Sequence, residues 1–464
     1  MMTFNANALS DFARFYGFHY GAFEPESLVR DLLIDMERGL AGQASSLQMI
    51  PSYLTPAARP RAGKKVLALD AGGTNLRAAV VSFDEAGKAF AASLQKAPMP
   101  GTRGRVSADE FFDQIAALAA PLLETEKDLA GMGFTFSYPM TITRDADGLP
   151  TAFSKELDAP EVLGRPVGAE LRRALGRRGI SFEGPIVLLN DTAATLLSGL
   201  SLIAADGGEG QSPGLAAGPV IGLILGTGFN TAYPEQRIPK IGFDVSDAQS
   251  AQIVVCETGA FALRFRGPLD LAFDRATKNP GAYSLEKTTS GAYLGPLTLF
   301  ILKQAVRDGV LAFARSSELL EMPHLETRDL NDLQRCPGSR PGPLGALFGA
   351  DEEAALASAL SLASLVTERG ALFSAAAAAA AAERLRQGGD FLPQAPLRIA
   401  VEGTTYLRYK GMRRAFEAHL HRMLNREKPC AYVVSPVEQA SLLGAAVAAL
   451  SPAGTGAPLA ERMG

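Results

Sequence analysis

The chain of 464 residues has no tryptophan, only three cysteines and only four histidines, and each shortage excludes a kind of site. Without tryptophan, and with aromatic residues at 7%, it offers little on which nucleic-acid bases could stack. Cys256, Cys336 and Cys430 lie far apart with no CxxC pair, so we expect neither a disulfide framework nor a zinc site. Because this usage fits a reducing compartment, we expect a cytoplasmic protein.

Charge and hydropathy argue against two classes of partner. The net charge of −4 provides no broad basic surface for a nucleic-acid backbone. No cationic start followed by an apolar block marks a signal peptide, and we expect no apolar stretch of membrane-spanning length. The run Ala375–Ala382 predicts a structural helix that a neighbouring helix can approach closely. We expect His419 and His421 to be solvated helix residues, and no nucleic-acid or membrane partner.

Two apolar segments repeat one pattern. LALDAGGTNLRAAVV begins at Leu67 and IGLILGTGFNTAYPE at Ile221, and each contains a glycine-rich turn between two apolar runs. Each predicts a β-hairpin, with Thr74 or Thr227 at its tip. Glycine lets a backbone come close to a bulky anion, and successive N–H groups can face its oxygens.

An ordinary turn that needs a positive φ would explain either hairpin alone. The repeat, about 150 residues apart, favours two tips that hold one nucleotide phosphate chain from both sides. Asp70 precedes the first tip and is expected near a Mg²⁺ ion held through water. The chain has no GxxxxGK[ST] motif and no GxGxxG after a strand, which argues against a Rossmann nucleotide site.

The order of expected elements indicates an α/β protein. The first sixty residues are expected to be helical, and strands alternate with helices from Val66 to Asp191, which predicts a mixed sheet covered by helices. Residues 204–218 and 335–345 read as loops by composition. A strand in PLRIAVEG is followed by a helix from about Gly411 and by a last helix between Glu438 and Leu450.

Asp191 is the strongest catalytic candidate. The segment IVLLNDTAATLL brings it to the end of an apolar strand, where a helix begins and where α/β proteins place ligands. It could instead be only the cap of that helix, a role that aspartate fills well. Beside two phosphate hairpins, a carboxylate that takes a proton from an alcohol is what phosphoryl transfer to a hydroxyl requires.

Four further polar residues end apolar runs: Ser137, Asn230, Glu257 and Glu286. They supply neutral and anionic hydrogen-bonding groups without a cationic cluster, which suits an uncharged, polyhydroxylated substrate.

The chain resembles the hexokinase family, within the actin-like ATPase superfamily. The resemblance is carried, in order and spacing, by SLQMIPSYL, LALDAGGTNLR, GFTFSYP, FSKE, LLNDTAATLL, GLILGTGFNTAYPE, ETGAFA, LEKTTSGAYLG and VEGTTYLRYKGM. It implies a duplicated ribonuclease-H-like fold with the active site between two domains. The small domain would comprise 66–191 plus 445–464, and the large domain 1–60 plus 195–444.

The resemblance also implies an activity and a set of site residues. The activity is ATP-dependent phosphorylation of the 6-hydroxyl of a hexose, with glucose as first choice, as the first step of glycolysis. Asp191 would be the general base, and sugar binding would close the domains. The hexose pocket would contain Ser137, Ser154, Lys155, Asn190, Asn230, Glu257 and Glu286. The ATP site would contain Asp70, Gly72, Gly73, Thr74, Asn75, Arg77, Gly226, Thr227, Gly403, Thr404 and Ser441. No residue is expected to bind the metal directly, since Mg²⁺ would come with ATP and water near Asp70.

The chain departs from the family's pattern at four places. Ala152-Phe153-Ser154-Lys155 replaces Asn-Trp-Thr-Lys, Thr258 replaces a tryptophan, Pro296 replaces a glutamate, and Leu443 replaces a lysine near the nucleotide. The first three could tune the choice of hexose, with mannose and fructose left open, and the last bears on nucleotide affinity. A sugar or nucleotide sensor and a polymerising actin-like ATPase are the alternative functions. Turnover with ATP and a panel of hexoses would separate them.

Overall fold

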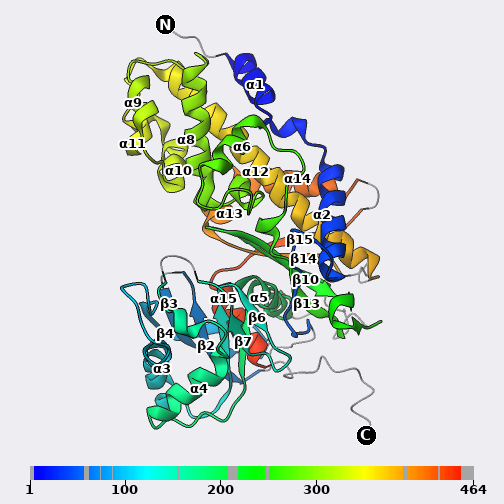
Figure 1. Ribbon diagram of the computed structural model, residues 1–464. Coiled ribbons are helices and arrows are strands. Elements are labelled where there is room, and N and C mark those ends of the chain that lie inside the picture. The colour runs from blue at the N-terminus through cyan, green and yellow to red at the C-terminus, as the bar shows by residue number, and fades with distance from the viewer. Residues whose placement is uncertain are drawn as a thin grey trace.

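The computed structural model describes residues 5–450 except 57–61, 74, 86, 154–156, 207–217, 247–249, 390–394 and 427–428. Two lobes, each built on one mixed sheet, are stacked on each other (Figure 1). Three of the predicted site residues, Thr74, Ser154 and Lys155, lie outside the described residues.

The small lobe contains a five-stranded sheet in the order β4-β3-β2-β5-β8. Its strands are β2 (Lys65–Ala71), β3 (Asn75–Phe83), β4 (Ala89–Pro98), β5 (Leu129–Phe136) and β8 (Ile186–Leu189). A separate pair, β6 (Met140–Ile142) and β7 (Gly148–Pro150), lies beside it. The helices α3 (Ala108–Thr125) and α4 (Val167–Arg177) pack on each other and on this sheet.

The large lobe contains a six-stranded sheet in the order β1-β13-β10-β9-β14-β15. Its strands are β1 (Ile50–Pro51), β9 (Val220–Leu225), β10 (Phe229–Glu235), β13 (Gln252–Val255), β14 (Leu397–Glu402) and β15 (Tyr432–Pro436). The pair β11 (Arg237–Ile238) and β12 (Phe243–Asp244) adds a short ribbon. The helices of this lobe are α1 (Ala6–Phe15), α2 (Pro25–Leu40), α6 (Pro268–Arg275), α7 (Glu286–Thr289), α8 (Gly291–Arg307), α9 (Ser316–Glu321), α10 (Thr327–Arg335), α11 (Gly342–Gly345), α12 (Glu353–Gln387), α13 (Thr404–Arg408) and α14 (Met412–Leu424).

The two sheets share one topology. In the small lobe β4, β3 and β2 are antiparallel neighbours, and β5 and β8 follow in parallel. In the large lobe β13, β10 and β9 are antiparallel neighbours, and β14 and β15 follow in parallel. The two repeated hairpins therefore occupy equivalent places in two copies of one unit, as their sequence similarity indicated.

Both predicted hairpins form. Ala71 pairs with Leu76 beside the first tip, and Leu225 pairs with Phe229 beside the second. None of the described tip glycines has a positive φ, so the ordinary-turn alternative does not account for them. At Gly228 a Cβ atom would lie 3.0 Å from a carboxylate oxygen of Glu286, so at this position glycine supplies room.

Two helices exchange between the lobes. α5 (Asp191–Asp206) follows the last strand of the small sheet but packs on β9 and β14 of the large sheet. α15 (Ala440–Ala449) follows the last strand of the large sheet but packs on β2 and β5 of the small sheet. The two helices also pack on each other, and Figure 1 shows both at the junction of the lobes. The expected domain limits at 191–195 and 444–445 fall at these helices and stay a prediction.

Side chains alternate between two cores along β2. Leu67 and Leu69 join a cluster with Phe111 of α3, whereas Val66 and Ala68 join a cluster with Ala445 of α15. Successive strand residues face opposite sides of a sheet, so a strand covered on both faces is apolar throughout. The cluster around α5 and α15 also contains residues of the large sheet, including Ala232 of β10 and Ala400 of β14.

The long helix α12 forms the centre of the large lobe. The alanine run Ala375–Ala382 is buried along its whole length, and α12 packs on α2 and α14, as the expected close approach requires. By length and composition α12 could cross a membrane, so the expectation of no stretch of that length is wrong. Inside the protein, 67% of its most apolar 18-residue window is buried.

Two local expectations fail in the large lobe. His419 is 4% exposed and its Nε2 lies 2.9 Å from Glu368 Oε1, so it is a buried partner and not a solvated residue. The segment 335–345, expected to be a loop, contains the short helix α11 and a 3₁₀ turn at Pro337–Ser339. The first difference follows from the packing of α12 on α14, and in the second α11 packs on α10; local composition reports neither contact.

A matched pair of glycine substitutions tests the contact between α5 and α15. A Cβ atom on Gly444 would overlap the carbonyl oxygen of Ala194, so Gly444→Ala is expected to cost about 1–3 kcal/mol and lower the thermal midpoint. Gly176 in α4 has open space around it, and Gly176→Ala should stabilise by roughly 0.5–1 kcal/mol. Equal midpoints for the two variants would contradict the close approach of these helices.

Candidate active site

A cavity of about 200 Å³ lies between the lobes, with lining residues from both. It is smaller than the pockets of about 300–1,000 Å³ that take drug-sized ligands, and suits a small molecule. It brings together six predicted residues: Ser137, Asn190, Asp191, Asn230, Glu257 and Glu286. It also contains residues that sequence reasoning did not place in the site, among them Ile50, Ser52 and Tyr138.

Asn190, rather than Asp191, caps helix α5. The side-chain oxygen of Asn190 accepts a 2.7 Å hydrogen bond from the backbone N–H of Thr192, and its carbonyl accepts from Ala194. A side-chain acceptor at this position satisfies one of the free N–H groups of the first helical turn. The alternative of Asp191 as a mere cap is therefore wrong, and its carboxylate is left for the cavity.

The Asp191 carboxylate has an elevated proton affinity. Burial raises its pKa, and hydrogen bonds from Thr192 and Ser137 offset part of that rise. The Thr192 hydroxyl donates to Asp191 Oδ1 at 3.2 Å. Because Ser137 follows β5 and Asp191 follows β8, the parallel pairing of these strands brings both residues to the same edge of the sheet.

Glu257 faces Asp191 from the large lobe in a strained backbone conformation. It follows β13 with φ of 58°, a left-handed value that a residue with a side chain rarely adopts and that often marks a functional site. Asn230 Nδ2 donates to Glu257 Oε1 at 2.9 Å, while Asn230 Oδ1 accepts from the backbone N–H of Thr258. Burial and the negative charge of Asp191 raise the pKa of Glu257 to about 7.

Glu286 is the first residue of α7, and its Oε2 accepts the backbone N–H of Phe229 at 3.1 Å. Burial raises the pKa of Glu286, and this hydrogen bond lowers it in part. Three carboxylates from two lobes thus line one small cavity, where each can accept hydrogen bonds from hydroxyl groups.

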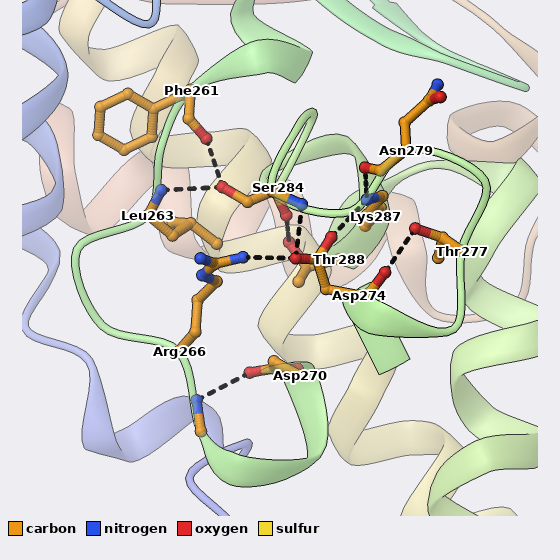
Figure 2. Close-up of polar contacts among 12 residues, drawn as sticks. Phe261, Leu263, Arg266, Asp270, Asp274, Thr277, Asn279, Ser284, Lys287 and Thr288 are labelled. Atoms are coloured by element: carbon orange, nitrogen blue, oxygen red, sulfur yellow. Dashed lines mark hydrogen bonds and ion pairs between the residues drawn. The ribbon is translucent and has the colours of Figure 1, made fainter. Parts of the chain in front are cut away.

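A polar network around Asp274 and Lys287 anchors α7 (Figure 2). The ammonium group of Lys287 donates to Asp274 and, at 2.6 Å, to the carbonyl of Asn279. Asp274 also accepts hydrogen bonds from Arg266 at 3.1 Å and from the backbone N–H of Gly281 at 2.9 Å. Burial alone would raise the pKa of Asp274, but these partners lower it overall. The network fixes the chain on both sides of Glu286.

The second hairpin tip is held by two helices. The carbonyl of Gly226 accepts the hydroxyl of Thr405 at 2.8 Å and the backbone N–H of Gly291 at 2.7 Å. Gly403 lies against this tip with φ of 126°, and a Cβ there would overlap Leu225, so only glycine fits. The side chain of Thr227 at the tip is exposed.

The first hairpin carries a buried ion pair. Asp70 stands opposite Arg77 in the hairpin register, and Arg77 Nε donates to Asp70 Oδ2 at 2.7 Å. Burial raises the pKa of Asp70 to about 6 although Arg77 lowers it. Arg77, predicted to meet phosphate, is thus engaged with Asp70. Tyr138, which lines the cavity, donates its hydroxyl to the carbonyl of Gly73 at 2.9 Å and so connects the cavity to this tip.

Glu402, just before Gly403, is a site residue that sequence reasoning missed. Burial and the charges of Asp191 and Asp70 raise its pKa to about 7, so these carboxylates act on one another across the lobes. The hydroxyl of the predicted Ser441 lies 3.5 Å from Glu402. The sequence did hold a signal for Glu402, because this residue ends an apolar strand directly before Gly-Thr-Thr. Within the described residues no group of three or more His, Cys, Asp or Glu is arranged to hold a metal ion.

Three of the departures from the expected motifs have packing partners. Phe153 packs edge-on against Tyr138 with ring centroids 5.3 Å apart, and Thr258 shares a 2.5 Å hydrogen bond with Thr231. Leu443 packs against the cluster between the lobes, where the family pattern has a lysine. Pro296 lies within α8, and nothing in the structure explains it.

The two sheets of shared topology and the carboxylate-lined cavity between them define a two-lobed α/β protein with a small-molecule site between its lobes. Two family models, both described as hexokinase, match residues 17–200 and 220–451. Hexokinase-1 of Oryza sativa subsp. japonica is 30% identical over 450 residues, covering 89% of this chain and 85% of the rice protein. Hexokinase-1 of Saccharomyces cerevisiae is 28% identical over 313 residues, covering 64% of this chain and 61% of the yeast protein.

A solved structure of the hexokinase from Schistosoma mansoni, complexed with glucose, has the same fold with a TM-score of 0.70 at 23% identity. The match covers 96% of this chain and 99% of that one. The chain therefore belongs to the hexokinase family, and it is an ATP-dependent hexose phosphotransferase.

Proposed function

We propose that the enzyme transfers the γ-phosphoryl group of ATP to the 6-hydroxyl of a hexose, with glucose as the preferred sugar and Asp191 as general base. The observation that carries the proposal is the carboxylate of Asp191, released from capping by Asn190 and directed to a cavity with Glu257 and Glu286. Asn230 and these glutamates offer hydrogen-bond partners to an uncharged sugar.

The reaction assigns each group one task. The hydroxyl oxygen attacks the γ-phosphorus, the bond from this phosphorus to the ADP oxygen breaks, and the hydroxyl proton passes to Asp191. A positioned base accelerates the reaction by about 10²- to 10⁴-fold. Holding the two reactants in line contributes much of the remaining rate acceleration. A raised pKa suits Asp191 to this task, because a base works best when its pKa approaches the working pH.

A magnesium ion fits the nucleotide side of this site. Asp70 and Glu402 supply carboxylate oxygens, the donor type that Mg²⁺ prefers, and a cation would relieve the repulsion that raises the pKa of Glu402. These residues would hold it through water. When bound, the ion neutralises charge on the phosphates.

A coupled assay tests the function. Purified enzyme with ATP and Mg²⁺ is expected to turn over glucose, and mannose and fructose are compared at equal concentration. Binding of sugar without turnover would indicate a sensor, and polymerisation with ATP hydrolysis that no sugar stimulates would indicate an actin-like filament protein.

Closure of the lobes is expected to depend on the sugar. The cavity takes residues from both lobes, so a sugar that contacts Asp191 and Glu257 together stabilises the closed arrangement. Small-angle scattering should show a smaller radius of gyration with glucose, and ATP alone should do less. A sugar lacking the 6-hydroxyl should stimulate ATP hydrolysis, because it leaves Asp191 facing water. Sugar-free hydrolysis at the full kinase rate would exclude closure as the source of specificity.

Activity and stability should respond to pH in opposite directions. Burial raises the pKa of Glu257 from 4.5 to about 7 and that of Asp70 from 3.8 to about 6. The pH dependence of kcat/KM reports the pKa values of essential groups in the free enzyme. The value of kcat/KM should therefore fall as the pH drops below about 7, where Glu257 becomes protonated. Between about pH 4.5 and 7 the folded state holds protons that the unfolded chain has lost. The contribution of these carboxyl groups to the stability of the fold therefore decreases as the pH rises. The thermal midpoint of Glu257→Gln should therefore depend less on pH than that of the wild type. A flat kcat/KM from pH 5.5 to 8 would contradict the assignment.

A further inference from the structure

A cationic groove of about 440 Å³ lies on the large lobe, apart from the catalytic cavity. It is formed by the end of α10, the connection from α13 to α14, and the first turns of α14. We call it the α13–α14 groove. Its charged lining residues are Arg335, Arg408, Lys410, Arg413, Arg414 and Glu417.

The groove carries a surplus of positive charge. Its five cations against one carboxylate leave four formal positive charges, on a chain whose net charge is −4. Glu417 is already engaged, since it accepts from Arg413 and from the Tyr406 hydroxyl, each at 2.8 Å. The guanidinium of Arg408 has no hydrogen bond or ion pair in the part of the chain that the structure describes. Like charges gathered so closely repel one another, and an anion would relieve that repulsion.

Backbone contacts hold the cationic segment in place. Arg335 donates to the carbonyl of Arg408 at 3.1 Å, which ties α10 to the end of α13. The backbone N–H of Lys410 donates to Asn331 Oδ1 at 2.9 Å, and the Lys410 ammonium group donates to the carbonyl of Gln334. The guanidinium of Arg413 lies over the Tyr406 ring, 5.9 Å from its centroid. These contacts pre-organise Arg335, Lys410 and Arg413, which lowers the entropy lost when a ligand binds to them.

The amino end of α14 adds to the same field. Gly411 precedes this 13-residue helix with φ of 85° and provides no side-chain cap. The first N–H groups of a helix carry a partial positive charge, so the helix favours an anion at the same place as the arginines.

We propose that the α13–α14 groove binds a small anion with two or more phosphate groups, at a site separate from the catalytic cavity. Four surplus charges match the charge of such an anion, and guanidinium groups bind phosphate oxygens in pairs. The volume lies in the range of small-molecule sites and is small for a macromolecular surface. The phosphate groups could come from an inorganic polyphosphate or from a bisphosphorylated metabolite, which share this chemistry.

Calorimetric titration with sodium tripolyphosphate tests the proposal, at constant ionic strength and without Mg²⁺. The double variant Arg408→Ala/Arg414→Ala should bind about tenfold or more weakly than the wild type. Arg237→Ala/Arg264→Ala removes the same charge at two exposed positions of the large lobe outside the groove and should bind within about twofold of the wild type. Circular dichroism checks that each variant is folded. Both double variants replace exposed side chains only, so the fold should be preserved.

The outcomes separate the proposal from its alternatives. Undiminished binding by the groove variant, or equal loss in both variants, would overturn it, because the probe would then sit at the catalytic phosphate site or respond to bulk charge. No binding by the wild type at millimolar probe would also overturn it. A parallel titration with a hexose bisphosphate distinguishes the metabolite from the polymer as the source. If the protein bound vesicles of anionic phospholipid but neither soluble probe, the proposal would be overturned, because the groove would then bind a membrane surface.

Discussion

The variant Asp191→Asn is expected to lose at least about 10²-fold and up to about 10⁴-fold in kcat, the range of a lost general base. The amide has the shape of the carboxylate but cannot take the hydroxyl proton. Because Asn190 supplies the cap of α5, the helix keeps its amino-terminal hydrogen bond in this variant. The fold and the sugar affinity should therefore be largely preserved in Asp191→Asn. We expect the same of Asp191→Ala.

Steady-state kinetics with glucose and ATP, together with sugar binding by calorimetry, measure this effect. Asp109→Asn is the matched control, since Asp109 also lies in the first turn of a helix, α3, but is exposed on the surface. It should retain its kcat. A near-normal kcat in Asp191→Asn would remove Asp191 from the mechanism.

The second large effect is expected at the two glutamates of the large lobe. Glu257→Gln and Glu286→Gln should each weaken hexose binding by about 1.5–3 kcal/mol, the value of a hydrogen bond to a charged group, which is roughly 10- to 150-fold in Kd. Glutamine keeps an acceptor for Asn230 at position 257 and for the N–H of Phe229 at position 286, so the local structure should persist.

The affinity for ATP should stay nearly unchanged in both variants, because Glu257 lies outside the hairpin tips and glutamine at position 286 keeps the acceptor that holds the N–H of Phe229 beside the second tip. Glu318→Gln, an exposed residue of α9, controls for the loss of one negative charge. An unchanged KM for the sugar combined with altered ATP binding would show that the pocket is assigned wrongly.

The sequence alone determined the elements whose signals are local. Each hairpin follows from two apolar runs around a glycine turn, and the repeat of that pattern predicted the duplication that both sheets confirm. Asp191 was found because a strand of β-branched and leucine residues ends at Leu189, two residues before it. The order of the motifs was sufficient to indicate the family, since order and spacing survive where single residues change.

Only the tertiary structure decided features that depend on segments far apart in the chain. Asn and Asp cap helices about equally well, so the choice of Asn190 over Asp191 was not readable from their types. The raised pKa of Glu402 needs Asp70 and Asp191, which come from the other lobe, and burial that the whole fold creates. His419 finds Glu368 only because α12 and α14 pack together. Periodicity and turn chemistry act over a few residues, whereas burial, charge interactions and cavities arise when distant segments meet, and so they are decided by the fold.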